Sequence, residues 1–169
     1  IRQHLLQRIN LPIEQAADLQ LQLDTLFGTD TSMQRTACEV AAKNRITLIT
    51  GGPGTGKTTV ARLLGRIFAH LGILSRGQMI EVSRGNLVAG YVGQTAIKTR
   101  GQIDRALDGV LFVDEAYALS RGGQNDGGND FGAEAIEQIL LAMENERDRM
   151  SFVFAGYTRP MADLLGSNP

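Results

Sequence analysis

The first part of the chain carries apolar residues at helical spacing. Pro12 suits the first turn of a helix that Gly28 would end. Thr31 or Ser32 can cap a following helix. Residues 1–45 are therefore predicted to form an α-helical segment that precedes the main domain. The apolar positions of the two helices are Ala16, Leu19, Leu23, Leu26 and Phe27, then Met33, Ala37, Val40 and Ala41.

From residue 46 onward the pattern changes to alternating strands and helices. Apolar runs such as 110–113 are continuous, which is typical of strands covered on both faces. The prediction for residues 46–169 is an α/β domain, a three-layer sandwich with a parallel sheet and helices on either side. Ligands bind such sheets at the carboxyl ends of the strands. The predicted strands are 46–50, 79–83, 110–114 and 151–155, and the predicted helices are 57–71, 94–107 and 132–147.

A glycine-rich segment between the first predicted strand and helix carries the strongest chemical pattern. Residues 51–58 have a glycine, four further residues, then Gly-Lys-Thr, which is the P-loop pattern. Glycines let backbone N–H groups turn toward a phosphate, and the following helix adds its positive end. Lys57 can reach the β- and γ-phosphates of ATP, and the Thr58 hydroxyl can bind Mg²⁺. The predicted nucleotide-binding residues are Gly52, Pro53, Gly54, Thr55, Gly56, Lys57, Thr58 and Thr59.

Two carboxylates follow the apolar run at 110–113. Asp114 can hold Mg²⁺, directly or through water, and Glu115 can polarise the water that attacks the γ-phosphate. Strand-end carboxylates are often only solvated, but this pair follows a P-loop in the same chain. The sequence therefore predicts a Mg²⁺-dependent ATPase with Lys57 and Glu115 as catalytic residues and Thr58 and Asp114 as metal ligands.

Composition narrows the set of partners. The formal net charge is −1, with only 3 lysines, so no phosphate-backbone footprint is visible and nucleic acid is not an expected partner. The single cysteine, Cys38, fits a reducing compartment and is expected to be at least half-buried. No apolar run approaches the length of a membrane span, and no signal peptide is evident. The expectation is a soluble cytoplasmic protein without a membrane partner.

From Gly51 onward the chain resembles the AAA+ ATPases, and within them the CbbX, SpoVK and EccA group. The resemblance implies an ATPase core that remodels protein clients, assembles as a hexameric ring and binds ATP and ADP. It also implies that Tyr91 and Val92 lie in a pore loop that grips the client, with residues 120–130 as a second pore loop. Without the resemblance, the favoured interpretation of Tyr91 is a packed residue on a turn. The matching stretches are 51–62, 86–95, 107–119, 129–132, 143–149 and 154–157, with Gly-Ser-Asn-Pro at 166–169.

The sequence also departs from that group. The usual sensor asparagine after the fourth strand is not obvious, and Tyr157 or Thr158 falls near its place. The chain is expected to stop before the last strand, the arginine finger and the helical lid. Loss of such a finger lowers hydrolysis by roughly 10³ or more in other classes. A nucleotide-binding module with little turnover is therefore an alternative.

The N-terminal part of the chain resembles a different family from the rest. Residues 18–60 are similar to the segment of RecD-type helicases that leads into their P-loop. That resemblance implies that Gln34 binds the adenine edge, since its amide can both donate and accept. Without that resemblance, the favoured interpretation of Gln34 is a solvated helix residue. A chimera and a divergent helical region both explain the similarity. A helicase ATPase remains an alternative, although the Gly-Asp-x-x-Gln expected of it is absent from 155–160.

Overall fold

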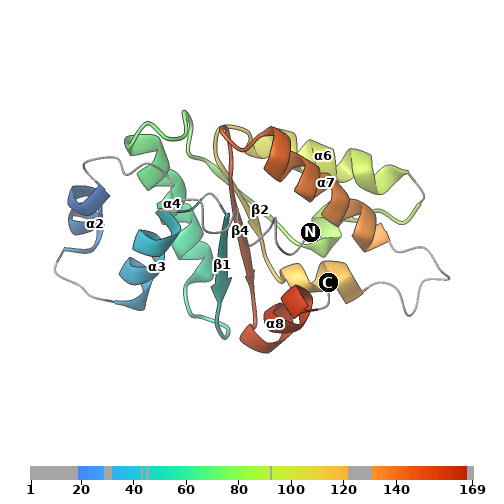
Figure 1. Cartoon of the computed structure of the whole chain (residues 1–169), viewed down its shortest axis with the longest axis horizontal. Coiled ribbons are helices and arrows are strands. Elements are labelled where there is room, and N and C mark those ends of the chain that lie inside the picture. Colours follow the sequence, from blue (N-terminus) through green and yellow to red (C-terminus); the bar gives the residue numbers. More distant parts are fainter. Residues whose placement is uncertain are drawn as a thin grey trace.

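A computed structural model describes residues 19–28, 32–42, 44, 46–91, 93–121 and 131–166. These residues form a parallel sheet between two layers of helices (Figure 1). The strands are β1 (Ile46–Thr50), β2 (Met79–Val82), β3 (Val110–Val113) and β4 (Ser151–Gly156). The helices are α2 (Leu19–Phe27), α3 (Met33–Ala42), α4 (Lys57–His70), α5 (Arg84–Leu87), α6 (Gln94–Ala106), α7 (Phe131–Asn145) and α8 (Thr158–Gly166), with a 3₁₀ helix, η1 (Ala116–Arg121).

The strand order confirms the predicted fold class. The four strands are all parallel and lie in the order β1-β4-β3-β2, so β1 forms one edge of the sheet in the described part of the chain. Because the strands are parallel, their carboxyl ends share one edge. The P-loop after β1 and the acidic pair after β3 therefore meet at that edge.

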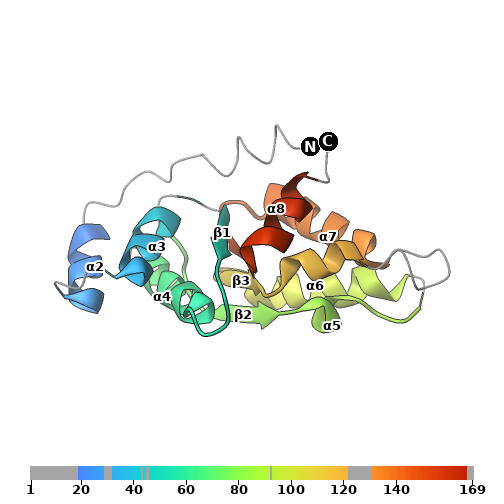
Figure 2. The ribbon, with the colours of Figure 1, turned by 90° about the horizontal axis from the view of Figure 1, so that it is seen from below.

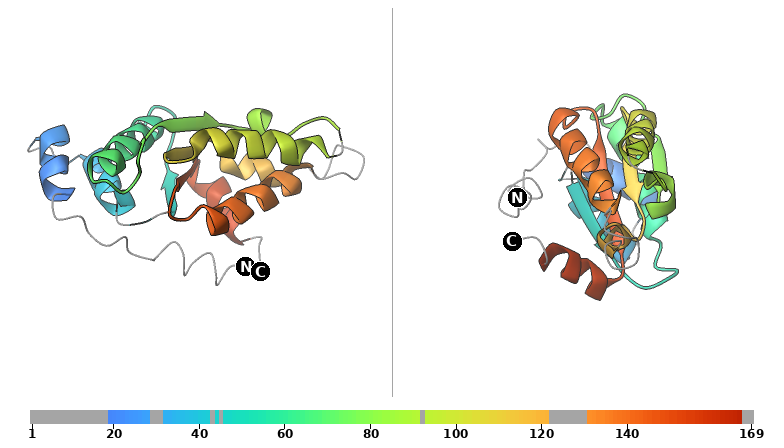
Figure 3. Two further views of the ribbon diagram at one scale, coloured as in Figure 1. Left: turned by 90° about the horizontal axis from the view of Figure 1, so that it is seen from above. Right: turned by 90° about the vertical axis from the view of Figure 1, so that its right-hand side faces the viewer.

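Two hydrophobic cores lie on opposite faces of the sheet. In β3, Val110 and Phe112 belong to one core, and Leu111 and Val113 belong to the other. We call the first side the α4 face, because α2, α3 and α4 cover it, and the second the α7 face, because α5, α6, η1, α7 and α8 cover it. Figure 2 and Figure 3 show the same division from two further sides. All four residues of β3 are buried, as its continuous apolar run predicted.

The cysteine prediction is confirmed on the α4 face. Cys38 is fully buried in α3, and burial raises the pKa of its thiol from 9.0 to about 11. Among the helices of the described ranges, none is both long enough and apolar enough to cross a bilayer.

Several element ends differ from the predictions. The predicted strand 79–83 stops at Val82, because Ser83 and Asn86 form a capping box that begins α5. The predicted strand 110–114 stops at Val113, since the backbone turns at Asp114 and Glu115 has a φ of 48°. Helix α7 ends at Asn145 rather than at 147, because residues 146–149 form turns. Ser120 and Arg121 lie in η1 rather than in the predicted pore loop.

Three elements were not predicted from the pattern: α5, η1 and α8. Each is short, and each begins two or three residues after the last residue of a strand. Other predictions concern residues outside the described ranges, namely the helix start at Pro12, the pore-loop residue Val92 and most of the segment 120–130.

Candidate functional site

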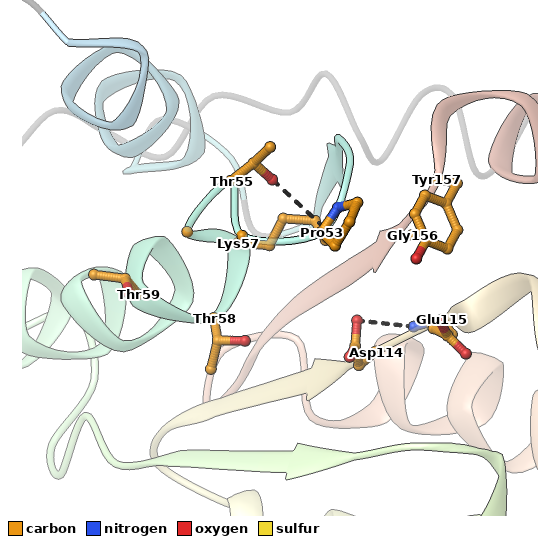
Figure 4. Close-up of a pocket in the computed structure, with 11 residues that line it drawn as sticks. Pro53, Thr55, Lys57, Thr58, Thr59, Asp114, Glu115, Gly156 and Tyr157 are labelled. Carbon is orange, nitrogen blue, oxygen red and sulfur yellow. Dashed lines mark hydrogen bonds between the residues drawn. The ribbon is translucent and has the colours of Figure 1, made fainter.

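A cavity of about 430 Å³ lies at the carboxyl edge of the sheet (Figure 4). This volume is within the usual range for small-molecule sites. The residues that line it are Pro53, Gly54, Thr55, Gly56, Lys57, Thr58, Thr59, Asp114, Glu115, Gly156 and Tyr157. The structure thus brings the P-loop residues and both carboxylates together, although about 55 residues separate them in the sequence. Gly52 is exposed beside this lining.

The P-loop has the backbone geometry that a phosphate cradle requires. Gly54 and Gly56 have φ values of 74° and 80°, in the left-handed region that favours glycine. Gly56 is also the N-cap of α4, and within the described ranges no side chain caps that helix end. The N–H groups of the first turn of α4 therefore border the cavity with the positive end of the helix behind them.

Lys57 turns toward its own loop. Its Nζ donates to the carbonyl oxygens of Gly51 at 3.0 Å and Gly52 at 2.8 Å. The Thr55 Oγ1 lies 3.5 Å from the same nitrogen. The ammonium group has no carboxylate partner among the described residues. Its charge is therefore available to an anion once it leaves the two carbonyl groups.

The acidic pair lies on the opposite side of the cavity. The Asp114 N–H donates to the Val82 carbonyl at 2.8 Å, which fixes the end of β3 against β2. The Asp114 Oδ1 accepts from the Glu115 N–H at 3.0 Å. Glu115 is exposed and has a left-handed backbone, which is uncommon for a non-glycine residue. Such outliers cluster at functional sites.

The oxygen donors around the cavity fit Mg²⁺. The Thr58 hydroxyl and the Asp114 carboxylate both face it, and hard oxygen ligands suit this ion. In the described part of the chain no group of three or more His, Cys, Asp or Glu side chains could hold a metal. A site with two protein oxygens is the arrangement expected where phosphates and water complete the coordination.

Gln34 contacts the P-loop from outside the cavity lining. A Cβ atom at Gly56 would lie 2.4 Å from the Gln34 Nε2, so this amide occupies the space beside the glycine. Helix α3 is therefore in direct contact with the phosphate loop. Any side chain at position 56 would displace Gln34 as well as strain the backbone.

Tyr91 lies apart from the cavity. Its side chain is 73% exposed, so it is not the packed turn residue of the alternative interpretation. It follows α5 on the α7 face. Ile97, on the first turns of α6, is 75% exposed. Val92 lies outside the described residues.

Sequence reasoning did not assign Gly156 and Tyr157 to the site. The Tyr157 ring centroid lies 5.9 Å from the Lys57 Nζ and 6.2 Å from the Tyr117 ring centroid. In Figure 4 its hydroxyl end points toward the side of the cavity that holds Asp114 and Glu115. A Cβ at Gly156 would lie 2.8 Å from Tyr117 and 2.9 Å from Met161. The position of Tyr157 at a strand end, near the expected place of the sensor residue, was the available indication.

Comparison with known proteins agrees with this geometry. Residues 47–167 match the family described as "ATPase family associated with various cellular activities (AAA)". The match begins within β1, so it does not test the N-terminal helices, and the similarity of that segment to RecD-type helicases stays a prediction. The family match favours the AAA interpretation over the helicase alternative.

Individual relatives belong to the group predicted from the motifs. The chain is 49% identical to Stage V sporulation protein K of Bacillus subtilis over 70% of its length and 36% of the relative. It is 48% identical to the ESX-1 secretion system protein EccA1 of Mycolicibacterium smegmatis, over 77% of the chain and 22% of the relative. It is 50% identical to the chloroplastic ribulose bisphosphate carboxylase/oxygenase activase of Cyanidioschyzon merolae, over 71% of the chain and 40% of the relative. The chain thus matches well under half the length of each.

Proposed function

This chain belongs to the AAA family of ATPases, and from that premise we propose that it binds and hydrolyses Mg²⁺-ATP in the cavity at the carboxyl edge of the sheet. One observation carries the proposal. A glycine cradle with a helix N-terminus and a lysine faces two strand-end carboxylates across a single cavity of suitable size. Neither half alone would suffice, since phosphate binding and water activation require groups of opposite charge.

The P-loop binds and orients the triphosphate in this proposal. The backbone N–H groups of residues 54–59 would donate to phosphate oxygens, and the α4 N-terminus adds its partial positive charge. Lys57 leaves the carbonyls of Gly51 and Gly52 and donates to the β- and γ-phosphates. Because both of these contacts are made by the Nζ at the end of a flexible side chain, a rotamer change of Lys57 is enough to release them.

The acidic pair and Thr58 complete the chemistry. Thr58 and Asp114 would hold Mg²⁺, which neutralises charge that develops on the phosphates. Glu115 accepts a proton from the attacking water, directly or through a second water. Its turn projects it past the end of β3, where the γ-phosphate of a nucleotide in the cradle would lie.

Gln34 is proposed to contact the nucleotide from the α3 side. Its amide already lies against Gly56, so a base that extends from the cradle toward α3 would meet it. An amide offers one donor and one acceptor, which matches the adenine edge.

We further propose that the ATPase module works on a protein client. The support is that Tyr91 is exposed on a loop outside the cavity, and that relatives carry the names of a secretion system protein and an activase of another enzyme. Tyr91 and Val92 would grip an unfolded segment, and ring assembly, as a hexamer, would present several such loops to one client.

Calorimetry tests the nucleotide site. Titration of the folded chain with ATPγS and with ADP, each with Mg²⁺, should give one binding event per chain. A steady-state phosphate-release assay with ATP then distinguishes an ATPase from a binding module with little turnover. No heat of association for well-folded protein would refute the site. Binding without phosphate release would refute only the hydrolysis.

A further inference from the structure

Arg84 connects two segments that are far apart in the sequence. It is the first residue of α5 and is half-buried. Its Nη1 donates to the carbonyl oxygens of Ala118 at 3.1 Å and Leu119 at 3.2 Å, both in η1. Charge-assisted hydrogen bonds away from bulk water are stronger than exposed ones, so this contact holds η1 against α5.

The same turn carries Glu115. The Ala118 N–H donates to the Glu115 carbonyl at 2.7 Å, while the Ala118 carbonyl accepts from Arg84. One residue therefore links the guanidinium group to the backbone of Glu115. A left-handed glutamate persists only where its surroundings hold the turn, and this pair of hydrogen bonds supplies such a hold.

The other end of α5 leads to Tyr91. Side chains of α6 fix the backbone on the way: Lys98 donates to the carbonyls of Gly85 and Val88, at 2.8 Å each. The buried Thr99 hydroxyl donates to the Leu87 carbonyl, and the Thr95 hydroxyl accepts from the Ala89 N–H. Residues 84–89 are thus held on both sides, by α6 and by η1. Tyr91 lies just beyond the last of these contacts.

The start of α7 packs on the same point. A Cβ at Gly132 would lie 2.0 Å from the Leu119 carbonyl oxygen and 2.6 Å from the Arg84 Nη1. The glycine is required here because the helix, the 3₁₀ turn and the guanidinium group approach closely. A substitution at Gly132 would therefore disturb the contact between Arg84 and η1 while Arg84 itself stays in place.

We propose that Arg84 is a positioning residue for Glu115: it holds the turn after β3 and ties the placement of this carboxylate to the loop that carries Tyr91. Arg84 does not line the cavity, so it acts through the Ala118 backbone and not on the nucleotide. The functional part of this inference rests on the proposed ATPase function. The structural part does not.

Hydrogen–deuterium exchange on the nucleotide-free chain tests the structural part. In Arg84→Met, amides of residues 115–121 should exchange about tenfold faster or more, since two charged hydrogen bonds are lost. Arg84→Lys keeps a positively charged donor group without the planar guanidinium, so it should recover part of the protection. Gly132→Ala should loosen the same residues although Arg84 is intact. Arg105→Met serves as the matched control, because the only side-chain donation of this exposed arginine among the described residues is to Gln102 on its own helix, and the variant should leave 115–121 unchanged.

Kinetics on the same proteins test the functional part. Arg84→Met should lower kcat about tenfold and change the Kd for Mg²⁺-ADP by less than twofold, with partial rescue of kcat by lysine. Equal exchange at 115–121 in the wild type and in Arg84→Met would overturn the proposal. A parallel loss of kcat and nucleotide affinity would also overturn it, because that pattern indicates general destabilisation. A wild-type chain without turnover would instead refute the ATPase proposal, and the exchange result would still decide the role of Arg84.

Discussion

The two faces of the sheet contribute to the site in different ways. The α4 face supplies the phosphate cradle from one continuous stretch, β1, the P-loop and α4, with Gln34 added from the helix before it. The end of β3 supplies the acidic pair, and the α7 face adds η1 and the Tyr91 segment, which are linked by long-range contacts such as that of Arg84 with η1. Both faces meet at the cavity.

This difference between the two faces predicts that nucleotide affinity and the rate of hydrolysis depend on different residues. In the proposed mechanism, residues on the α4 face would contact the phosphates directly, so their loss should lower affinity. In the same proposal, Glu115 after β3 would orient a water molecule and residues of the α7 face would hold its position, so their loss should lower turnover while affinity remains. The following substitutions test this division, from the largest expected effect to the smallest.

Lys57→Ala should remove nucleotide binding. Two charge-assisted hydrogen bonds to phosphate, at about 1.5–3 kcal/mol each, correspond to a loss of about 10² to 10⁴ in affinity. Calorimetry with Mg²⁺-ADP measures it. Arg62→Ala, an exposed change on the same helix, is the control. Affinity within threefold of the wild type would contradict the P-loop assignment.

Glu115→Gln should leave affinity intact and stop turnover. Loss of a general base typically costs about 10² to 10⁴ in rate, and the amide keeps the shape of the side chain. Phosphate release and ATPγS titration together report the two effects. If affinity falls as far as turnover, Glu115 serves the metal or the fold and the division between the faces is wrong.

Leu23→Ala should destabilise the fold by about 2–5 kcal/mol, because Leu23 is fully buried in the core of the α4 face. Leu21 lies on the same helix and is 63% exposed, so Leu21→Ala should change the free energy of unfolding by less than about 0.5 kcal/mol. Urea unfolding of the two variants compares them. Equal effects would show that Leu23 of α2 does not pack in the core of the α4 face as described.

The buried thiol of Cys38 predicts that the free energy of unfolding depends on pH. Because burial raises the thiol pKa from 9.0 to about 11, the native state keeps the proton that the unfolded chain loses first. The stability that this group contributes is complete below pH 9 and is lost as pH rises toward 11. Unfolding free energies from pH 8 to 11 should therefore decline less steeply in Cys38→Ala than in the wild type. Parallel curves would contradict the shift.

Tyr91→Ala should have the smallest effect on the isolated chain. The side chain is 73% exposed, so thermal midpoint and basal phosphate release should stay near the wild-type values. The predicted loss is in client-stimulated turnover, measured in the assembled protein with an unfolded polypeptide as the probe. A collapse of basal turnover would instead place Tyr91 in the packing of the α7 face.

Most of the fold followed from local patterns. The P-loop, the strand before it and the helix after it form one short stretch, so glycine spacing and helical periodicity were sufficient to predict them. The four strands were found within one residue at each end, because their apolar runs are bounded by polar residues or glycine. The acidic pair was found for the same reason, at the end of an unbroken apolar strand.

The sequence by itself determined the P-loop, the parallel sheet and the membership of Asp114 and Glu115 in one site, since each depends on neighbouring residues and on the common direction of the strands. Only the tertiary structure decided that Gln34 lies against Gly56, that Tyr157 faces the cavity, and that Arg84 holds the turn of Glu115. Those contacts join residues 22 to 100 positions apart, or depend on short elements with no periodicity of their own. These contacts depend on how elements distant in the sequence pack together in the fold. A local sequence pattern does not indicate which distant side chain fills a given space.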